Sequence, residues 1–356
     1  MNGQHSGAVW TPMWVMLSVM ILGGVSAVVM KMESLTDPGR SFALDVSRQL
    51  DIDDSLLHYT ESEPIALPVT DAHSFAVGPD GHIVLCGEMS VIVLDDAGGL
   101  LRELPLQSRP RCVAVAGQRH AHQGRIYVGC QNTVEVFAAD GAPVDSWSID
   151  AKYPLLTAIA ASNDRVYVAD AGNQTVMVFD ESGHRVEDIG SGFIVPSEYF
   201  DLSAEPNGLI HIVNPGARRI ETYTADRKKE SEWGQAGANM NDFFGCCNPV
   251  HIAMLPGGRF VTSEKGIARI KIYDDRGNMQ CLVAGTQQLM QRHSTQTDGI
   301  QNELVLVADV FDIDVDPQGN VLVLDQARDE IRKFALVENK VFVENKVFVE
   351  NKVNEP

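Results

Sequence analysis

The sequence predicts an all-β fold, a β-propeller of six blades, preceded by one N-terminal transmembrane helix. Three observations carry this prediction. Short strands of alternating apolar residues, separated by Gly, Asp and Asn turns, recur as similar units about every 40 to 60 residues. No stretch within these units has helical periodicity. Ahead of the units, residues 8–30 form an almost wholly apolar run.

Six units make up the predicted propeller, which spans residues 73–336. The third is the clearest, because Arg165–Gly183 contains two alternating strands and a closing Asp-x-x-Gly turn. A β-sandwich or a solenoid is the alternative, but similar antiparallel units that cannot each bury both faces alone favour closure into a ring. The units are 73–98, 112–141, 157–183, 200–223, 250–277 and 311–334.

One unit carries a resemblance to a known family. The stretch Val166–Asp180, which reads VYVADAGNQTVMVFD, resembles the consensus of the NHL repeat, and the other five units are similar but more degenerate. The loop Gly245–Ala253 and the stretch Thr262–Gly266 resemble a bacterial group of membrane-linked NHL proteins. The resemblance implies a six-bladed propeller of NHL repeats. It implies no activity, because propellers of this family include binding scaffolds, lyases and hydrolase-like members.

The N-terminus predicts a membrane anchor. After a short tail, 1–7, the run 8–30 is long enough as a helix to cross a hydrocarbon core, and the first thirty residues lack Asp, Glu, Lys and Arg. A signal peptide cleaved after Val25-Ser-Ala27 is the alternative. The missing positive charge before the run and the length of the run favour an uncleaved anchor.

The sequence predicts the orientation of the anchor less clearly than its presence. Lys31, Arg40 and Arg48 follow the span, and charge alone would place them in the cytoplasm. A large domain after one N-terminal span is more often exported. We therefore expect a single-pass protein of the bacterial inner membrane with its propeller on the periplasmic or extracellular side.

Two further segments flank the propeller. Residues 31–72 form an acidic linker, in which Glu63–Val69 resembles a strand and is expected to supply the outer strand of the sixth blade. At the other end, residues 337–356 repeat seven residues in tandem. We expect this tail to be frayed, although its alternation would also suit one edge strand.

Charge excludes one class of partner. Lys and Arg number 28 against 48 Asp and Glu, so the formal net charge is −20. Such a chain repels a phosphate backbone, so nucleic acid is not an expected partner.

Aligning the six units predicts a ring of side chains at the mouth of the central channel, because the first strand of each blade lines that channel. Among them, Asp201, His251 and Asp312 come from consecutive blades and could bind a divalent metal. In the alternative, the carboxylates cap backbone N–H groups and His251 is a hydrogen-bonded core histidine. The ring members are Ser74, Cys112, Ala158, Asp201, His251 and Asp312.

Adjacent cysteines, Cys246 and Cys247, lie in the loop before the first strand of the fifth blade. They could form a strained vicinal disulfide, bind a soft metal or act as a redox pair. In the plainer interpretation one is buried and the other is bonded elsewhere. The even total of six cysteines also suits ordinary pairing in an exported protein.

The sequence contains no catalytic motif such as Gly-x-Ser-x-Gly or His-Glu-x-x-His. We therefore expect a membrane-tethered scaffold that binds other membrane or extracytoplasmic proteins, or a ligand, at the channel mouth. The expected binding residues are Cys112, Asp201, Cys246, Cys247, His251 and Asp312. A metal-dependent hydrolase or lyase using Asp201, His251 and Asp312 is the alternative. A third possibility is an accessory subunit of a membrane redox complex.

Overall fold

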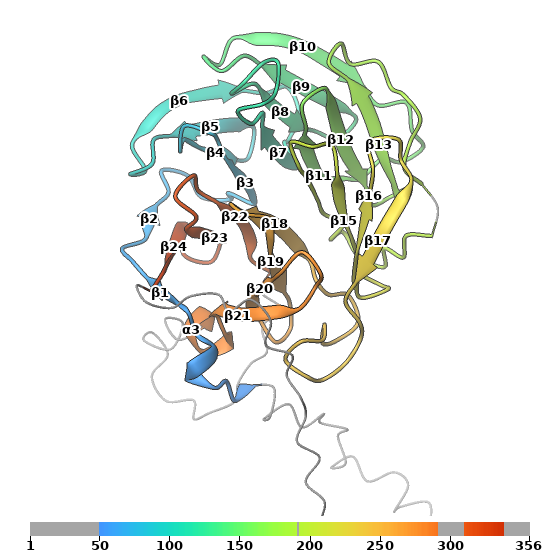
Figure 1. Cartoon of the computed structure of the whole chain (residues 1–356). Helices are drawn as coiled ribbons and strands as arrows, with labels where there is room; N and C mark the ends of the chain where they lie inside the picture. Colours follow the sequence, from blue (N-terminus) through green and yellow to red (C-terminus); the bar gives the residue numbers. More distant parts are fainter. Residues whose placement is uncertain (1–49, 191, 291–309, 338–356) are drawn as a thin grey trace, which may run out of the picture. The chain divides into compact units, whose positions relative to one another are not determined.

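The computed structural model describes residues 50–190, 192–290 and 310–337. In these residues six antiparallel sheets are arranged radially around one axis (Figure 1). The predicted all-β, six-bladed propeller is confirmed. No helix in these ranges has the length and apolar character needed to cross a membrane. The predicted anchor, 8–30, and the tail beyond residue 337 lie outside the described residues.

The blades follow one another along the chain, each from an inner to an outer strand. Blade one comprises β3 (Ser74–Val77), β4 (Ile83–Cys86), β5 (Ser90–Leu94) and β6 (Leu100–Pro105). Blade two comprises β7 (Cys112–Val115), β8 (Ile126–Gly129), β9 (Thr133–Phe137) and β10 (Pro143–Ser148). Blade four comprises β14 (Leu202–Ala204), β15 (Ile210–Asn214), β16 (Arg219–Tyr223) and β17 (Lys229–Trp233). Blade five comprises β18 (His251–Leu255), β19 (Arg259–Glu264), β20 (Arg269–Tyr273) and β21 (Met279–Ala284).

Blade three departs from the four-stranded pattern. Its sheet comprises β11 (Leu156–Ala161), β12 (Arg165–Asp170) and β13 (Thr175–Asp180). The next segment meets β13 only through two isolated bridges, Phe179 to Arg185 and Val176 to Ile189. The segment's apolar residues Val186 and Ile189 are three positions apart. That spacing breaks the alternation of a strand, so a regular fourth strand does not form.

Blade six is closed by the start of the described chain. Its own strands are β22 (Asp312–Val315), β23 (Val321–Asp325) and β24 (Glu330–Leu336). On the outer side of β24 lie β1 (Tyr59–Glu61) and β2 (Ile65–Ala66), both antiparallel to it. The pairing of Ile65 with Ile331 falls within the strand-like segment Glu63–Val69. The first and the last of the described strands therefore share one sheet, which closes the ring.

A buried ion pair reinforces this closure. The Arg332 guanidinium is fully buried and donates through Nε and Nη2 to the Glu61 carboxylate, both at 2.8 Å. Its Nη1 donates to the Leu289 carbonyl of α3 (Thr286–Met290) at 3.0 Å. Such bidentate pairing fixes β1 on β24 with a defined geometry.

The core consists of layers between neighbouring blades. Each of the six hydrophobic clusters joins residues of two adjacent blades, and the cluster between blades six and one completes the circle. The apolar faces that no single blade can bury are thus covered by its neighbours.

A repeated Asp-x-x-Gly turn sets the spacing of these layers. In blade five, Asp274 Oδ1 accepts hydrogen bonds from the backbone N–H groups of Arg276 and Asn278, and Gly277 has φ +80°. A Cβ on Gly277 would lie 2.5 Å from Trp233 of blade four. Gly183 of blade three receives Trp147 of blade two in the same way. The turn glycine is therefore required both by its backbone conformation and by close packing between blades.

We predict that Gly277→Ala lowers the free energy of unfolding by about 3 kcal/mol, because it adds overpacking against Trp233 to the cost of a left-handed backbone. Gly258→Ala is the matched control. Gly258 has φ +81° but open space where the Cβ would stand, so we expect a loss of only about 1 kcal/mol. Urea unfolding of both variants measures the difference. Equal losses would contradict the proposed packing.

Candidate functional site

The inner strands enclose a central channel. β3, β7, β11, β14, β18 and β22 each contact the inner strands of both neighbouring blades and surround the axis (Figure 1). Together they line a cavity of about 210 Å³. Each of these strands is hydrogen-bonded to its own sheet on one side only. The other edge faces the channel, so its backbone N–H groups need acceptors from elsewhere.

All predicted ring members line this channel. Those that bear no charge are Ser74, Cys112 and Ala158. The Cys112 thiol is buried, and burial, with the nearby Cys130 and Asp201, raises its pKa far above the ordinary value. Cys112 is therefore a neutral wall residue rather than a reactive or anionic group.

Three aspartates supply the missing acceptors through one repeated arrangement. Asp201 accepts from its own neighbour Leu202 N at 2.8 Å and from Ile252 N of the next blade at 2.9 Å. Asp312 likewise accepts from Ile313 N at 2.9 Å and from Phe75 N of blade one at 3.1 Å. Each carboxylate thus bonds one N–H group of its own blade and one of the following blade.

The third aspartate, Asp314, follows the same rule two residues further along β22. It accepts from Val315 N and from Val77 N, both at 2.7 Å. Burial raises the pKa of this carboxyl to about 7, with Asp312 and Asp201 adding to the effect and the two N–H groups opposing it. The junctions between blades four and five and between blades six and one therefore rest on carboxylates in the channel.

His251 contacts a carboxylate of each of these two blade junctions. Its Nδ1 lies 3.2 Å from Asp201 Oδ2 and 3.4 Å from Asp312 Oδ1. Burial opposes the charged form of the imidazole, but the combined effect of Asp312 and Asp201 raises its pKa above the ordinary value. Nε2 has no hydrogen-bond partner among the described residues, and the ring borders the wider cavity above the channel. The structure thus brings Asp201, His251 and Asp312 together as the repeat alignment predicted.

The geometry of these three side chains favours capping over metal binding. Their oxygens are directed to backbone N–H groups and to Nδ1, as described above. Across the described residues, no group of three or more His, Cys, Asp or Glu side chains is arranged to hold a metal ion. The divalent metal proposed for Asp201, His251 and Asp312 therefore gains no support from their arrangement.

The channel opens at one end into a cavity of about 510 Å³, here called the mouth. Blades one, three, five and six contribute to its wall, together with the loops that lead into blades two and four. Arg109 and Arg111, from the loop between β6 and β7, are exposed at the mouth, and neither guanidinium forms an ion pair or hydrogen bond with another described residue. The wall is formed mainly by His73, Ser74, Arg109, Arg111, Thr157, Glu198, Tyr199, His251, Asp312 and Gln326.

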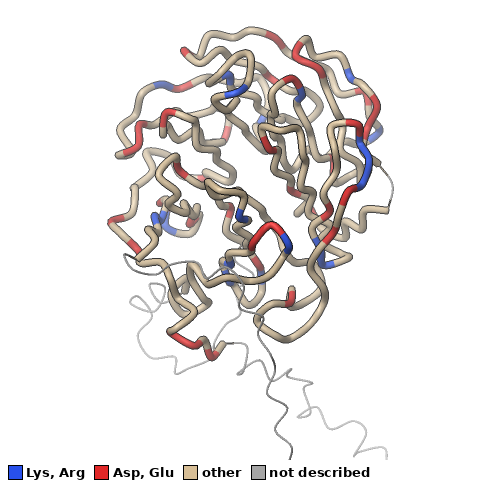
Figure 2. The backbone as a smooth tube through the Cα atoms, in the orientation of Figure 1, with Lys and Arg blue, Asp and Glu red and all other residues tan. Residues whose placement is uncertain are grey.

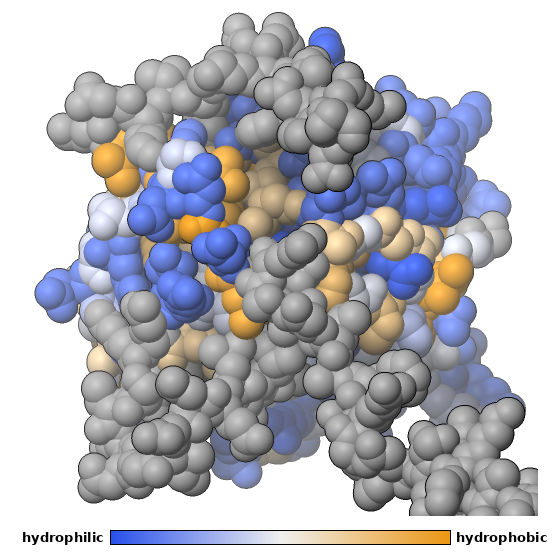
Figure 3. Space-filling model, turned by 90° about the horizontal axis from the view of Figure 1, so that it is seen from below, coloured by the Kyte–Doolittle hydropathy of each residue, from blue (hydrophilic) through white to orange (hydrophobic). Residues whose placement is uncertain are grey.

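Charged residues of both signs line the mouth, where Glu198, Asp312 and Asp325 accompany Arg109 and Arg111. Acidic and basic residues are spread over several blades (Figure 2), and most arginines are paired with carboxylates. On the side seen in Figure 3, apolar residues lie in small groups among hydrophilic ones where the surface is described. Arg119 and Arg276 are likewise exposed, with no side-chain ion pair or hydrogen bond to another described residue, so Arg109 and Arg111 differ from them in lining a cavity.

Cys246 and Cys247 lie outside the wall of the mouth, on the adjacent rim. Cys247 is buried and donates through Sγ to Cys246 Sγ at 3.4 Å, while Cys246 is exposed. Lys265 links this rim to the mouth, because its Nζ lies 4.4 Å from the centre of the Tyr199 ring. The predicted binding residues therefore fall into two groups. One group lines the channel and comprises Cys112, Asp201, His251 and Asp312. The other comprises Cys246 and Cys247 on the rim.

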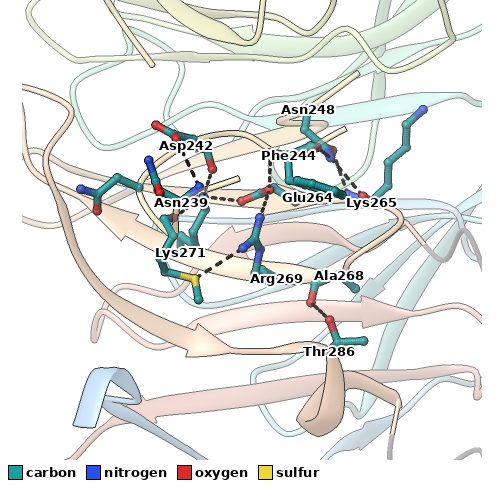
Figure 4. Close-up of polar contacts among 12 residues, drawn as sticks. Asn239, Asp242, Phe244, Asn248, Glu264, Lys265, Ala268, Arg269, Lys271 and Thr286 are labelled. Atoms are coloured by element: carbon teal, nitrogen blue, oxygen red, sulfur yellow. Dashed lines mark hydrogen bonds and ion pairs between the residues drawn. The ribbon is translucent and has the colours of Figure 1, made fainter. Parts of the chain in front are cut away.

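A buried charged cluster holds this rim in place (Figure 4). Glu264, Arg269 and Lys271 are fully buried on β19 and β20, and Arg269 Nη2 donates to Glu264 Oε2 at 2.8 Å. Lys271 Nζ donates to the carbonyls of Met240 and Asp242 at 3.0 and 2.8 Å. Burial lowers the pKa of Lys271 to about 8, although Glu264 opposes this change. The loop before β18 is thus tied to the interior of blade five.

Comparison with known proteins establishes the fold alone. No protein-family model and no curated protein matches the chain. Among solved structures, a streptogramin B lyase is 15% identical, with a TM-score of 0.52, over 78% of this chain and 98% of that one. Virginiamycin B lyase from Staphylococcus aureus is 14% identical, with a TM-score of 0.51, over 76% and 82% of the two chains. U3-55K is 11% identical, with a TM-score of 0.52, over 73% and 76%.

The mouth residues Arg109, Arg111 and Tyr199 were not predicted from the sequence. They lie in connections between blades, where length and composition differ from unit to unit. Repeat alignment finds positions that the units share, so it does not reach such loops. For Arg109 and Arg111, the one available signal was two neighbouring basic residues in an acidic chain. Tyr199 carried no such signal.

We predict that Asp314→Asn gains stability relative to the unaltered protein as the pH rises. The folded state retains the Asp314 proton up to about pH 7, whereas the unfolded chain releases it near 4. Stability is therefore lost between these values, by about 1 to 2 kcal/mol from pH 5 to 7. The single Asn oxygen can accept from Val77 N or from Val315 N but not from both, so the variant carries a constant loss to which this pH-dependent gain is added.

Urea unfolding at several pH values measures this effect, with the exposed Asp226→Asn as the control that shows no trend. A stability difference between Asp314→Asn and the unaltered protein that is independent of pH would contradict the buried carboxyl.

Proposed function

We propose that this chain is a binding module that grips a protein or ligand at the mouth. The observation that carries the proposal is a cavity of about 510 Å³ at the end of the channel, where Arg109 and Arg111 are exposed and form no ion pair or side-chain hydrogen bond with another described residue. Concave sites with a few convergent polar groups are where propellers and other scaffolds bind their partners. The carboxylates below the mouth hold the blades together and leave the wall rigid.

The proposed partner presents an acidic group. Arginine pairs carboxylates and phosphates bidentately, and it is enriched at the centre of protein interfaces. In a chain of net charge −20, an acidic partner would be repelled over most of the surface and attracted at these two side chains. An acidic segment of a membrane or extracytoplasmic protein fits this pattern.

We also propose that the propeller belongs with the NHL-repeat proteins and is tethered to the bacterial inner membrane. The repeat pattern of Val166–Asp180 supports the first point, and the apolar run 8–30 supports the second. With the propeller on the periplasmic side, the chain would act as an accessory subunit of a membrane complex. The mouth would then face proteins in or near the same membrane.

An enzyme is the alternative function. Two of the similar structures are lyases by name, whereas U3-55K is not, so the fold by itself does not choose between catalysis and binding. A hydrolase or lyase would need a reacting group at the channel, and His251 borders the mouth. Its metal-dependent form has no supporting ligand cluster in the described residues.

Site-specific photo-crosslinking in cells tests the binding function. We predict that a crosslinker at Gln326, in the mouth, gives a discrete adduct that co-purifies in mild detergent, whereas one at Gln118, at the opposite end of the channel, does not. Reversing both arginines (Arg109→Glu with Arg111→Glu) should lower the yield at least tenfold, because two opposite charges are lost.

Arg276→Glu, on an exposed turn of blade five, is the charge-matched control and should leave the yield unchanged. Equal adducts from both ends of the channel, or a yield insensitive to Arg109 and Arg111, would contradict the proposal. Turnover of an ester or lactone that is lost in His251→Ala would support the enzyme instead.

A further inference from the structure

The six cysteines fall into two groups. Cys86, Cys112, Cys130 and Cys281 are buried in the hydrophobic layers between blades. Cys246 and Cys247 lie in a surface loop with their Sγ atoms 3.4 Å apart, and Cys246 is exposed. Only the second group combines solvent access with a thiol neighbour within bonding reach.

A rigid frame encloses this dithiol. The Asn248 side chain donates to the carbonyls of Phe244 and Lys265, at 2.6 and 3.0 Å, and accepts from Lys265 N at 2.8 Å (Figure 4). Glu264 Oε2 accepts from Phe244 N at 3.3 Å and is itself held by the buried Arg269. Both ends of the segment 244–248 are therefore fixed to the turn that follows β19.

Between these fixed ends the chain retains one adjustable position. Gly245 has φ +85°, and a Cβ there would meet no atom closer than 3.7 Å. The distance between the two sulfur atoms is set by the side-chain torsions of Cys246 and Cys247 and by the peptide between them, and Gly245 has room to absorb the accompanying shift of the backbone. The frame keeps the thiols side by side and limits any change to Gly245–Cys247.

We propose that Cys246 and Cys247 form a reversible redox couple that exchanges with an external disulfide. The thiolate of Cys246 attacks one sulfur of the external disulfide, forms a mixed disulfide and releases one thiolate. The thiolate of Cys247 then attacks Cys246 Sγ and displaces the second. In total, the protein dithiol is oxidised to a Cys246–Cys247 disulfide, and the external disulfide is reduced to two thiols.

The assignment of roles follows from access. Cys246 is exposed and can meet a bulky disulfide, whereas Cys247 is 6% exposed and reaches only its neighbour. Burial, together with the neighbouring Cys246, raises the pKa of Cys247, and Lys265 partly opposes this. Cys247 is therefore the resolving thiol, which reacts once the mixed disulfide stands beside it.

Adjacent cysteines favour reversibility. Consecutive Cα atoms are about 3.8 Å apart, whereas disulfide-bonded cysteines usually have Cα atoms roughly 4.4 to 6.8 Å apart. A vicinal disulfide is consequently strained and easily reduced, a property of regulatory rather than structural disulfides. A metal site is less well matched, because no third His, Cys, Asp or Glu ligand joins the pair in the described part of the chain.

Oxidation at this loop would affect the rim next to the mouth, because Lys265 is bonded to Asn248 and stacks on Tyr199. The redox proposal nevertheless stands apart from the binding function. The experiment measures the oxidation state of Cys246 and Cys247, and its result does not depend on what the mouth binds.

Equilibration in glutathione buffers tests the proposal. The full-length chain, reduced and held in mild detergent, is incubated at a series of reduced-to-oxidised glutathione ratios, then acid-quenched, alkylated and mapped by mass spectrometry. We expect a Cys246–Cys247 disulfide whose fraction rises with oxidised glutathione and returns to the dithiol in excess reduced glutathione.

Single variants separate the two steps. Cys247→Ser should accumulate a glutathione adduct on Cys246, whereas Cys246→Ser should form either product at least tenfold less. Cys281→Ser, at a buried thiol, is the control that leaves the equilibrium unchanged. Asn248→Ala should lower the equilibrium constant for disulfide formation at least tenfold, because the frame that aligns the thiols is lost.

Three results would overturn the redox couple. In the first, both thiols remain open to alkylation in the most oxidising buffer. In the second, the unaltered protein stops at a glutathione adduct on Cys246. In the third, the disulfide does not return to the dithiol in excess reduced glutathione.

Discussion

Ring closure leaves each inner strand with an unpaired edge facing the channel, and much of the structure follows from how that edge is satisfied. At two blade junctions the acceptors are carboxylates. Asp201 and Asp312 each bond one N–H group of their own blade and one of the next. Because a buried N–H group without an acceptor costs about 1 to 3 kcal/mol, these contacts hold neighbouring blades in register.

This use of the carboxylates determines the electrostatics of the channel. Burial, with a smaller effect from the neighbouring Asp312 and Asp201, raises the pKa of Asp314. His251 offsets part of the negative charge at the junction of blades four, five and six. The carboxylates predicted as metal ligands accept hydrogen bonds from the backbones of two blades, and we propose the exposed arginines of the mouth as the residues that recognise a partner.

The sequence predicted those features of the structure that recur in every repeat unit. Period-two strands and Asp-x-x-Gly turns predicted six blades, and aligning the units placed Asp201, His251 and Asp312 around one axis, since equivalent positions in a ring must meet. The alignment could not decide between ligand and cap, because that depends on where each carboxylate oxygen points. Arg109, Arg111 and Tyr199 escaped prediction because they occupy loops that the repeat does not govern. The irregular edge of blade three depends on the spacing of only two apolar residues, Val186 and Ile189.

Hydrogen exchange at the channel edge tests the account most directly. The amide of Ile252 is bonded to Asp201 across a blade junction, so Asp201→Ala should speed its exchange at least tenfold while the ladder amide of Val128 in blade two keeps its rate. If the amide of Ile252 exchanges equally slowly in both proteins, Asp201 does not join the blades, and its place beside His251 must serve another purpose.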